Sequence, residues 1–236
     1  MNLRLLDALL IGMILLTCSC TPTVSRSLVL ADDFQNGLSN WSVELEKGGS
    51  VRATDGALDI DVPGGCTVWL KTLLEGPIII EYEVTAISAG GPNDRVSDLN
   101  CFWMARDARS PEDLFATTRS GKFDDYDQLR CYYVGLGGNG NTTTRFRRYI
   151  GRQNNRPLLP EHDLRDARHM IVPNVPQRIR IVSGQRIRYF RNDQKLFELD
   201  DPAPYTRGHF GFRTVASHLR VRHFRIYRSR DTGDSD

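Results

Sequence analysis

The chain has 236 residues, with 31 Lys and Arg against 29 Asp and Glu, a formal charge of +2 and 40% hydrophobic residues. This length suits one β-rich domain or two small ones, and the ordinary charged and aromatic fractions exclude a disordered, collagen-like or coiled-coil chain. The balanced total hides an asymmetry: residues 1–140 carry 11 basic and 19 acidic side chains, whereas residues 141–236 carry 20 basic and 10 acidic. Because 27 of the basic residues are Arg and only 4 are Lys, the C-terminal part is rich in arginine.

The first residues have the pattern of a secretory signal. An apolar run over residues 5–16 is too short to span a bilayer comfortably, and the segment Leu15-Leu16-Thr17-Cys18 resembles the cleavage box of bacterial lipoproteins. We therefore expect a signal peptide over residues 1–19, lipidation of Cys18 or Cys20, and a tether over 20–27. The expected location is the bacterial cell envelope, periplasmic or at the outer-membrane surface, with the lipid as the only membrane contact. An ordinary cleaved signal is the alternative.

Fourteen strand-like segments follow, and no segment keeps a helical period beyond about two turns. They are residues 27–34, 41–46, 50–54, 57–62, 67–72, 77–87, 99–106, 129–136, 142–149, 178–183, 186–191, 195–200, 208–215 and 219–228. The pattern predicts an all-β jelly-roll β-sandwich of two packed antiparallel sheets over residues 28–228, then a disordered tail over 229–236. Two long stretches, 107–128 and 151–176, are expected to be functional loops.

Several segments resemble concanavalin A-like lectin/glucanase sandwiches. They are LADDF at 30–34, NCFW at 100–103, YVGLGGNGN at 133–141, TRFRRY at 144–149 and GHFGFR at 208–213. The middle segments are similar to the YesU-type branch, a largely uncharacterised bacterial group associated with polysaccharide utilisation. The resemblance implies the concanavalin A-like fold and a carbohydrate-related function, and it supplies no catalytic residues.

Alternation along the strands assigns candidate site residues to one face. With Phe146, Phe210 and Phe212 in the core, the opposite face carries Arg145, Arg147, Tyr149, His209 and Arg213. Solvation of an exposed sheet is the alternative role of these arginines. Further candidates for sugar contacts are Trp103, Tyr133, Asn139 and Asn141.

Arginine is suited to bind carboxylate groups in a bidentate manner. A groove with Arg, Tyr and His therefore predicts lyase-type β-elimination on an acidic, uronate-containing polysaccharide. Arg147 would neutralise the uronate carboxylate, while Tyr149 and His162, or His169 from the same loop, would move the protons. The reaction requires no cofactor.

Two other functions remain open. One is a non-catalytic carbohydrate-binding protein. The other is a glycoside hydrolase with an atypical carboxylate pair such as Glu81 and Glu83, because the Glu-x-Asp-x-x-Glu run of retaining sandwich glucanases is missing. Nucleic acid is not an expected partner, because the basic residues are spread over strands and do not form a tail or a recognition helix.

Metal and cysteine chemistry have weak signals. Asp32 and Asp33 are candidate ligands of a structural Ca²⁺ ion. No CxxC or His-rich spacing indicates zinc. Cys66, Cys101 and Cys131 follow the signal segment, and the sequence allows either buried free thiols or one disulfide between Cys101 and Cys131.

Overall fold

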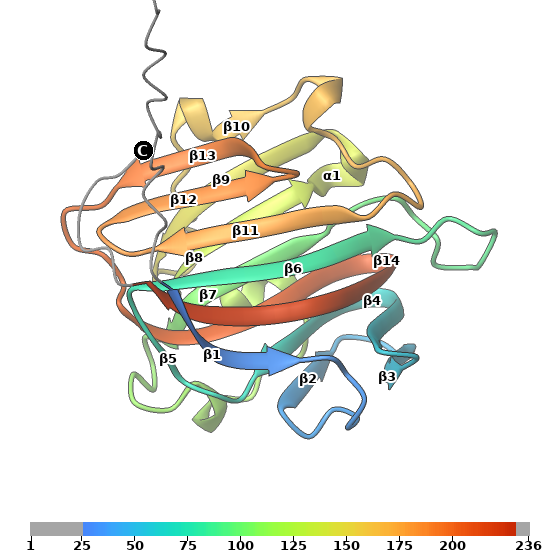
Figure 1. Cartoon of the computed structure of the whole chain (residues 1–236), viewed down its shortest axis with the longest axis horizontal. Coiled ribbons are helices and arrows are strands. Elements are labelled where there is room, and N and C mark those ends of the chain that lie inside the picture. The colour runs from blue at the N-terminus through green and yellow to red at the C-terminus, as the bar shows by residue number, and fades with distance from the viewer. Residues whose placement is uncertain (1–25, 230–236) are drawn as a thin grey trace, which may run out of the picture.

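A computed structural model describes residues 26–229 as an antiparallel β-sheet of fourteen strands that curls over itself into two packed layers (Figure 1). The predicted all-β jelly-roll sandwich is thereby confirmed. The strands are β1 (Arg26–Asp32), β2 (Trp41–Leu45), β3 (Ser50–Thr54), β4 (Ala57–Leu70), β5 (Leu74–Glu75), β6 (Ile78–Ala86), β7 (Asn100–Asp107), β8 (Leu129–Gly137), β9 (Thr143–Ile150), β10 (Asp163–Leu164), β11 (Gln177–Ser183), β12 (Arg186–Arg191), β13 (Gln194–Asp200) and β14 (Arg207–Ser229). Short 3₁₀ turns and α1 (Gly138–Asn141), a single turn, lie in the connections.

Two long strands, β4 and β14, belong to both layers. The first part of β14 pairs with β7, and its second part pairs with β6. The front layer of Figure 1 therefore runs β14-β6-β11-β12-β13, and the rear layer runs β14-β7-β8-β9-β10. The two long strands pair with each other across a bulge at Ala216, a non-glycine residue with a φ of 45°. A bulge bends its strand, which here carries the chain from one layer to the other.

The core lies between the layers and contains the side chains that alternation assigned to it. Phe210 and Phe212 pack there edge to face, with ring centroids 4.8 Å apart. Trp103 is also in this core, fully buried and stacked on Phe146 at an interplanar angle of 10°. The expectation that Trp103 lies on the sugar-binding face is therefore wrong, because β7 is apolar on both faces and its pattern does not tell them apart.

Several element boundaries differ from those predicted. The segments 57–62 and 67–72 form the single strand β4, because the Pro63-Gly64-Gly65 run lies in the bulge and does not reverse the chain. Proline is tolerated in a bulge, where no ladder N–H is required. The segments 208–215 and 219–228 likewise form one strand, β14. The two-residue strands β5 and β10 were not predicted.

The chain ends lie partly outside the described residues. Arg26 and Ser27, expected in the tether, are the first residues of β1, and Ser229, expected in the tail, is the last of β14. The predicted signal peptide, Cys18 and Cys20, and the rest of the tail are not among the described residues. Within residues 26–229, no helix has the length and apolarity to cross a membrane.

The three cysteines of the sandwich are buried free thiols. Cys101 lies in the core between the layers, whereas Cys131 lies in a second apolar cluster on the outer side of the rear layer. Burial raises the pKa of Cys66 and of Cys101 to about 12, so these thiols are not reactive near neutral pH.

The loop from Ala108 to Gln128, here called the strap, lies on the outer side of the rear layer. It covers an aromatic cluster in which Trp69 stacks on Phe102, with ring centroids 5.4 Å apart, and Phe102 stacks on Tyr126 of the strap. The Glu44 carboxylate accepts hydrogen bonds from Trp69 Nε1 at 2.9 Å and from the Tyr126 hydroxyl at 2.7 Å. It also pairs with the fully buried guanidinium of Arg119 at 2.7 Å. One carboxylate thus ties the strap to the sheet.

We predict that Glu44→Ala lowers the free energy of unfolding by about 2–4 kcal/mol, because it leaves the buried Trp69 Nε1 and Tyr126 hydroxyl donors without their acceptor and removes one of the two carboxylate partners of Arg119. Chemical denaturation measures it. The control is Glu112→Ala, which removes an 80% exposed carboxylate of the same loop and should change stability by less than about 0.5 kcal/mol. Equal effects of the two variants would contradict this assignment.

Candidate functional site

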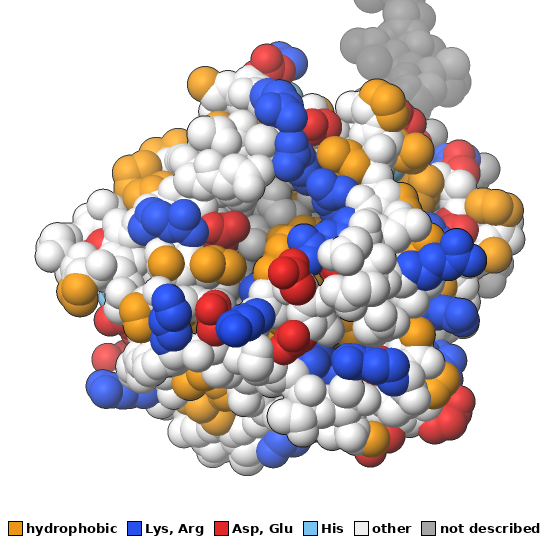
Figure 2. Space-filling model, turned by 180° about the vertical axis from the view of Figure 1, so that it is seen from behind, with side chains coloured by type: hydrophobic (Ala, Val, Ile, Leu, Met, Phe, Trp, Pro, Cys, Tyr) orange, Lys and Arg blue, Asp and Glu red, His pale blue; other side chains and the backbone are white. Residues whose placement is uncertain are grey.

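The face opposite to that of Figure 1 is hollowed near its centre, and Lys and Arg side chains gather around the hollow (Figure 2). A groove of about 280 Å³ lies there, over β7, β8, β9 and the first part of β14. The residues that line it are Arg95, Asp98, Asn100, Phe123, Tyr133, Gly135, Gly138, Asn139, Thr143, Arg145, Arg147, Arg213 and Val215. Four arginines against one aspartate make this lining strongly positive.

Strand register positions these side chains in two rows across the rear layer. In one row, Arg147 of β9 lies opposite Tyr133 of β8, which lies opposite Phe102 of β7. In the neighbouring row, Arg145 lies opposite Gly135, and Asn100 lies opposite Arg213. Residues two apart on a strand share a face, so both rows point to the same side of the sheet.

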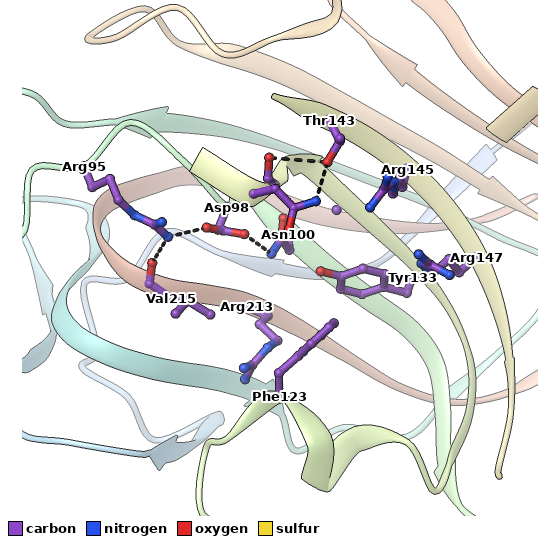
Figure 3. Close-up of a pocket in the computed structure, with 13 residues that line it drawn as sticks. Arg95, Asp98, Asn100, Phe123, Tyr133, Thr143, Arg145, Arg147, Arg213 and Val215 are labelled. Atoms are coloured by element: carbon purple, nitrogen blue, oxygen red, sulfur yellow. Dashed lines mark hydrogen bonds and ion pairs between the residues drawn. The ribbon is translucent and has the colours of Figure 1, made fainter. Parts of the chain in front are cut away.

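Gly135 leaves room for the Tyr133 ring. A Cβ atom at this glycine would lie 3.2 Å from the Tyr133 hydroxyl oxygen and from Cε1 of its ring, so the ring lies over the glycine. Its hydroxyl points into the groove (Figure 3). Burial, and secondly the Asp98 carboxylate, raise the pKa of Tyr133, which is therefore a protonated phenol near neutral pH.

Two of the four arginines have acidic partners. Arg145 forms a bidentate pair with Asp163 of β10, at 2.8 and 3.1 Å. Arg95 donates to Asp98 at 2.6 Å and to the carbonyl oxygen of Val215 at 2.5 Å. A carboxylate therefore neutralises each of these two guanidinium groups.

The other two arginines have no acidic partner within residues 26–229. Arg147 donates from Nη1 to the carbonyl oxygen of Arg156, and burial lowers the pKa of its guanidinium. Arg213 is 1% exposed and donates from Nη1 to Thr67 Oγ1 at 2.9 Å and to the Gly121 carbonyl at 3.0 Å. Its Nε and Nη2 atoms are buried and make no hydrogen bond, and nor does the Oδ1 atom of the facing Asn100. Such orphaned polar atoms are costly and are typical of functional sites.

The groove brings together five of the residues that the sequence assigned to the site. They are Tyr133, Asn139, Arg145, Arg147 and Arg213. Asn139 takes its place in α1 with a left-handed φ of 54° and donates to Thr143 Oγ1 at 3.1 Å. The arginine-bearing face was thus assigned correctly by alternation.

The remaining candidates lie elsewhere. Tyr149 shares the face of Arg147, as expected, but it is fully buried against Phe102 and Tyr133 and its hydroxyl makes no hydrogen bond. His162 packs on the core residues Phe146 and Phe197, and its Nε2 atom contacts the Glu198 carbonyl. Neither reaches the groove, so the expected arrangement of catalytic side chains is wrong.

Three other polar candidates have structural contacts. His209 is buried beneath the strap, where its Nδ1 atom contacts the Leu70 carbonyl oxygen. Asn141 holds a loop by hydrogen bonds with both backbone groups of Ile171. His169 is buried in its own loop and is absent from the groove lining.

The acidic candidates are also remote from the groove. Glu81 and Glu83 lie on the front layer, where Glu81 pairs with Arg26 at 2.5 Å. The Asp32 carboxylate accepts hydrogen bonds from Phe34 N and Trp41 Nε1, and Asp33 accepts one from Gln35 N. A cation at Asp32 would have to displace these donors. In the described part of the chain, no three His, Cys, Asp or Glu residues form a group suited to a metal ion.

Sequence reasoning missed five residues of the lining with functional side chains. They are Arg95, Asp98, Asn100, Phe123 and Thr143. Asn100 lies two residues from Phe102 in the predicted strand 99–106 and therefore shares its face, so alternation could have identified Asn100. Thr143 lies two residues from Arg145 in the predicted strand 142–149 and could have been identified in the same way. Arg95, Asp98 and Phe123 lie in connections between strands, so their positions depend on how these fold over the sheet.

The curled antiparallel sheet has the concanavalin A-like jelly-roll fold, as the resemblance in the sequence implied. Residues 60–224 match the family described as a domain of unknown function, DUF6250, and the chain belongs to this family. No curated protein matches the sequence.

Solved structures show the same fold at low sequence identity. A Bacillus subtilis protein of unknown function with a galectin-like fold is 16% identical, with a TM-score of 0.66 over 88% of this chain and 99% of that one. The carbohydrate-binding module CBM66 from Bacillus subtilis is 11% identical, with a TM-score of 0.53 over 79% and 94%. An endo-β-1,3-glucanase from Pyrococcus furiosus is 10% identical, with a TM-score of 0.53 over 87% and 95%.

We predict that the loop bearing Arg95 and Asp98 loosens in acid. Backbone N–H groups of Ala89 and Gly91, and then His218 Nδ1, bond to the Asp94 carboxylate and lower its pKa from 3.8 to about 2. A depressed pKa stabilises the folded state above the unfolded value, and this contribution is lost as the pH falls from about 4 to about 2.

Asp94→Asn should therefore lower the melting temperature above pH 4 and flatten its fall between pH 4 and 2. Thermal melts across this range measure it. Asp193→Asn, at a 74% exposed carboxylate, is the control and should leave the profile unchanged. An unchanged slope in Asp94→Asn would contradict the prediction.

We also predict that Arg213→Met changes the free energy of unfolding by no more than about 1 kcal/mol, although Arg213 is 1% exposed. The substitution removes two hydrogen bonds and the cation–π contacts with Tyr126 and Phe123, and this loss is offset because two buried N–H groups without a hydrogen bond disappear while the Met side chain keeps apolar contact with the rings. Trp103→Ala, at a structural position, should cost about 3–5 kcal/mol. A loss of that size in Arg213→Met would indicate that the arginine is structural.

Proposed function

We propose that this groove binds a negatively charged sugar unit, most simply a uronate, of an acidic polysaccharide. The observation that carries the proposal is the buried guanidinium of Arg213, which lies over the Tyr126 and Phe123 rings, at 4.5 and 5.0 Å, but has two donors without a hydrogen bond and no acidic partner in the described chain. Keeping an unpaired charge out of water costs several kcal/mol, and a bound anion offsets that cost.

Arg147 would make the direct contact with the carboxylate. It is more exposed than Arg213, has free donor capacity beyond its bond to the Arg156 carbonyl, and lies in the same groove as the Asn100 amide. A guanidinium can bind a planar carboxylate with two parallel hydrogen bonds. The positive lining then favours an acidic over a neutral sugar.

The aromatic residues of the groove suit the apolar C–H faces of a sugar ring. Tyr133 and Phe123 lie on the lining with ring centroids 5.8 Å apart. Binding of carbohydrate is also what the names of CBM66 and of other solved structures with this fold describe for those proteins. The arginine and the aromatic rings of the groove are sufficient for non-catalytic binding.

Elimination is a second candidate, favoured by the phenol of Tyr133 in the same groove as Arg147 and Asn100. In that reaction a base takes the C5 proton of the uronate, the electron pair forms the C4–C5 double bond, and the C4–O bond breaks as its oxygen is protonated. The raised pKa of Tyr133 suits the donor of that last proton. The reaction also needs a base for the C5 proton. Tyr133 is protonated near neutral pH, Asp98 is bound to Arg95, and Tyr149 and His162 lie outside the lining, so elimination has less support than binding.

Hydrolysis by two carboxyl groups has less support. Asp98 is the single carboxylate among the lining residues, and it is bound to Arg95. A hydrolase of the two-carboxylate type requires a pair about 5–10 Å apart.

We predict that the protein binds polygalacturonate, ulvan or chondroitin but not the neutral glucan laminarin. Arg147→Ala should weaken binding by about 10–100-fold, the value of a hydrogen bond to a charged group. Arg225→Ala removes the same charge from the exposed part of β14 on the front layer and should bind like the wild type. Isothermal titration calorimetry measures these affinities.

Ultraviolet absorbance of the same mixtures separates the two candidates. An unsaturated uronate product, lost in Tyr133→Phe, would establish elimination, whereas binding without product leaves the carbohydrate-binding role. Equal binding of laminarin, or full affinity in Arg147→Ala, would overturn the proposal.

A further inference from the structure

The strap divides the outer side of the rear layer into a covered part and an open part. Trp69, Phe102 and Tyr149 belong to the same face as the groove, yet all three are fully buried in the aromatic cluster, where Trp69 and Phe102 pack on Tyr126 of the strap. The open part is the groove of about 280 Å³. That volume lies just below the range of small-molecule pockets, about 300–1,000 Å³, so it accommodates a small portion of a ligand.

The strap is built as a fixed wall. Its backbone lies directly on β4, since a Cβ atom at Gly65 would lie 2.1 Å from the Gly121 carbonyl oxygen. Its Arg119 is fully buried between Glu44 and Asp107, at 2.7 and 3.1 Å. Opening the strap would expose these charges and the aromatic cluster together, which makes a mobile lid unfavourable.

Arg147, the arginine proposed to bind the carboxylate, lies next to this wall. Phe123 of the strap lies on the groove lining, and the Arg156 guanidinium stacks on its ring, with Cζ 4.2 Å from the centroid. Arg156 also pairs with Asp124 at 2.5 Å and with Asp127, which joins the second long loop to the strap. Because Arg147 donates to the carbonyl oxygen of Arg156, its guanidinium is held next to this junction. Figure 3 shows Phe123 and Arg147 on the strap side of the groove, opposite Arg95.

We propose that the groove takes the end of an acidic glycan chain and not its interior, an inference that rests on the proposed function of the groove. A sugar whose carboxylate binds Arg147 meets Phe123 and the Arg156 junction on its strap side. No further sugar follows in that direction, and the chain leaves on the side of Arg95 and Asn139. The recognised unit is thus a terminal acidic sugar.

The test is the number of protein molecules bound per glycan chain at saturation. Polygalacturonate, ulvan and chondroitin are each fractionated into short chains and chains several-fold longer, and the complexes of the full protein are sized by light scattering. Recognition of chain ends predicts one protein per chain at every length. A number that rises in proportion to length would overturn the proposal.

Two variants separate this outcome from failure of the proposed function. Arg147→Ala should abolish the one-to-one complexes, whereas Arg225→Ala should preserve them. Binding that rises with length but still requires Arg147 would refute end recognition alone. If no glycan binds, or if Arg147→Ala binds fully, the function itself is refuted. Should the glycan be cleaved, end recognition predicts short unsaturated products from the first turnovers, and products of intermediate length would contradict it.

Discussion

The carboxylate of Glu44 is the contact on which the shape of the site depends. It accepts hydrogen bonds from Trp69 and Tyr126 and pairs with the buried Arg119, so one side chain of β2 fixes the strap on the sheet. Without the strap, the sandwich would offer one continuous face with exposed aromatic rings. With it, the part of that face over β7, β8, β9 and β14 becomes a short groove that ends at a wall and is lined by arginine.

Charge asymmetry along the chain has a structural meaning. The acidic N-terminal part and the arginine-rich C-terminal part neutralise each other across the sandwich: Arg156 pairs with Asp124 and Asp127, and Arg220 pairs with Asp59. Few arginines are therefore left to support the anionic ligand that the arginine content suggested. Arg147 and Arg213 stand in one groove without an acidic partner in the described residues, and burial makes Arg213 the more costly of the two to retain.

Most of the fold was predictable because short strands have a period of two and end at turn residues. The strands β3 and β12 have the bounds that were predicted for them. Prediction failed at the bulges, where Pro63-Gly64-Gly65 looks like a turn in sequence but lies within β4. A bulge and a turn use the same residue types, and only the pairing with β14 separates them.

The sequence by itself determined which face of β9 and β14 carries the arginines, since alternation opposite Phe146 and Phe212 leaves Arg147 and Arg213 no other direction. Tertiary structure decided which of these side chains share a site. Strand register set Asn100 opposite Arg213, packing against Phe102 and Tyr133 buried Tyr149, and the path of the strap brought Phe123 to the groove. The path of the second long loop placed His162 against the core residues Phe146 and Phe197. Contacts between loops and sheets join residues far apart in the chain, and no local period encodes them.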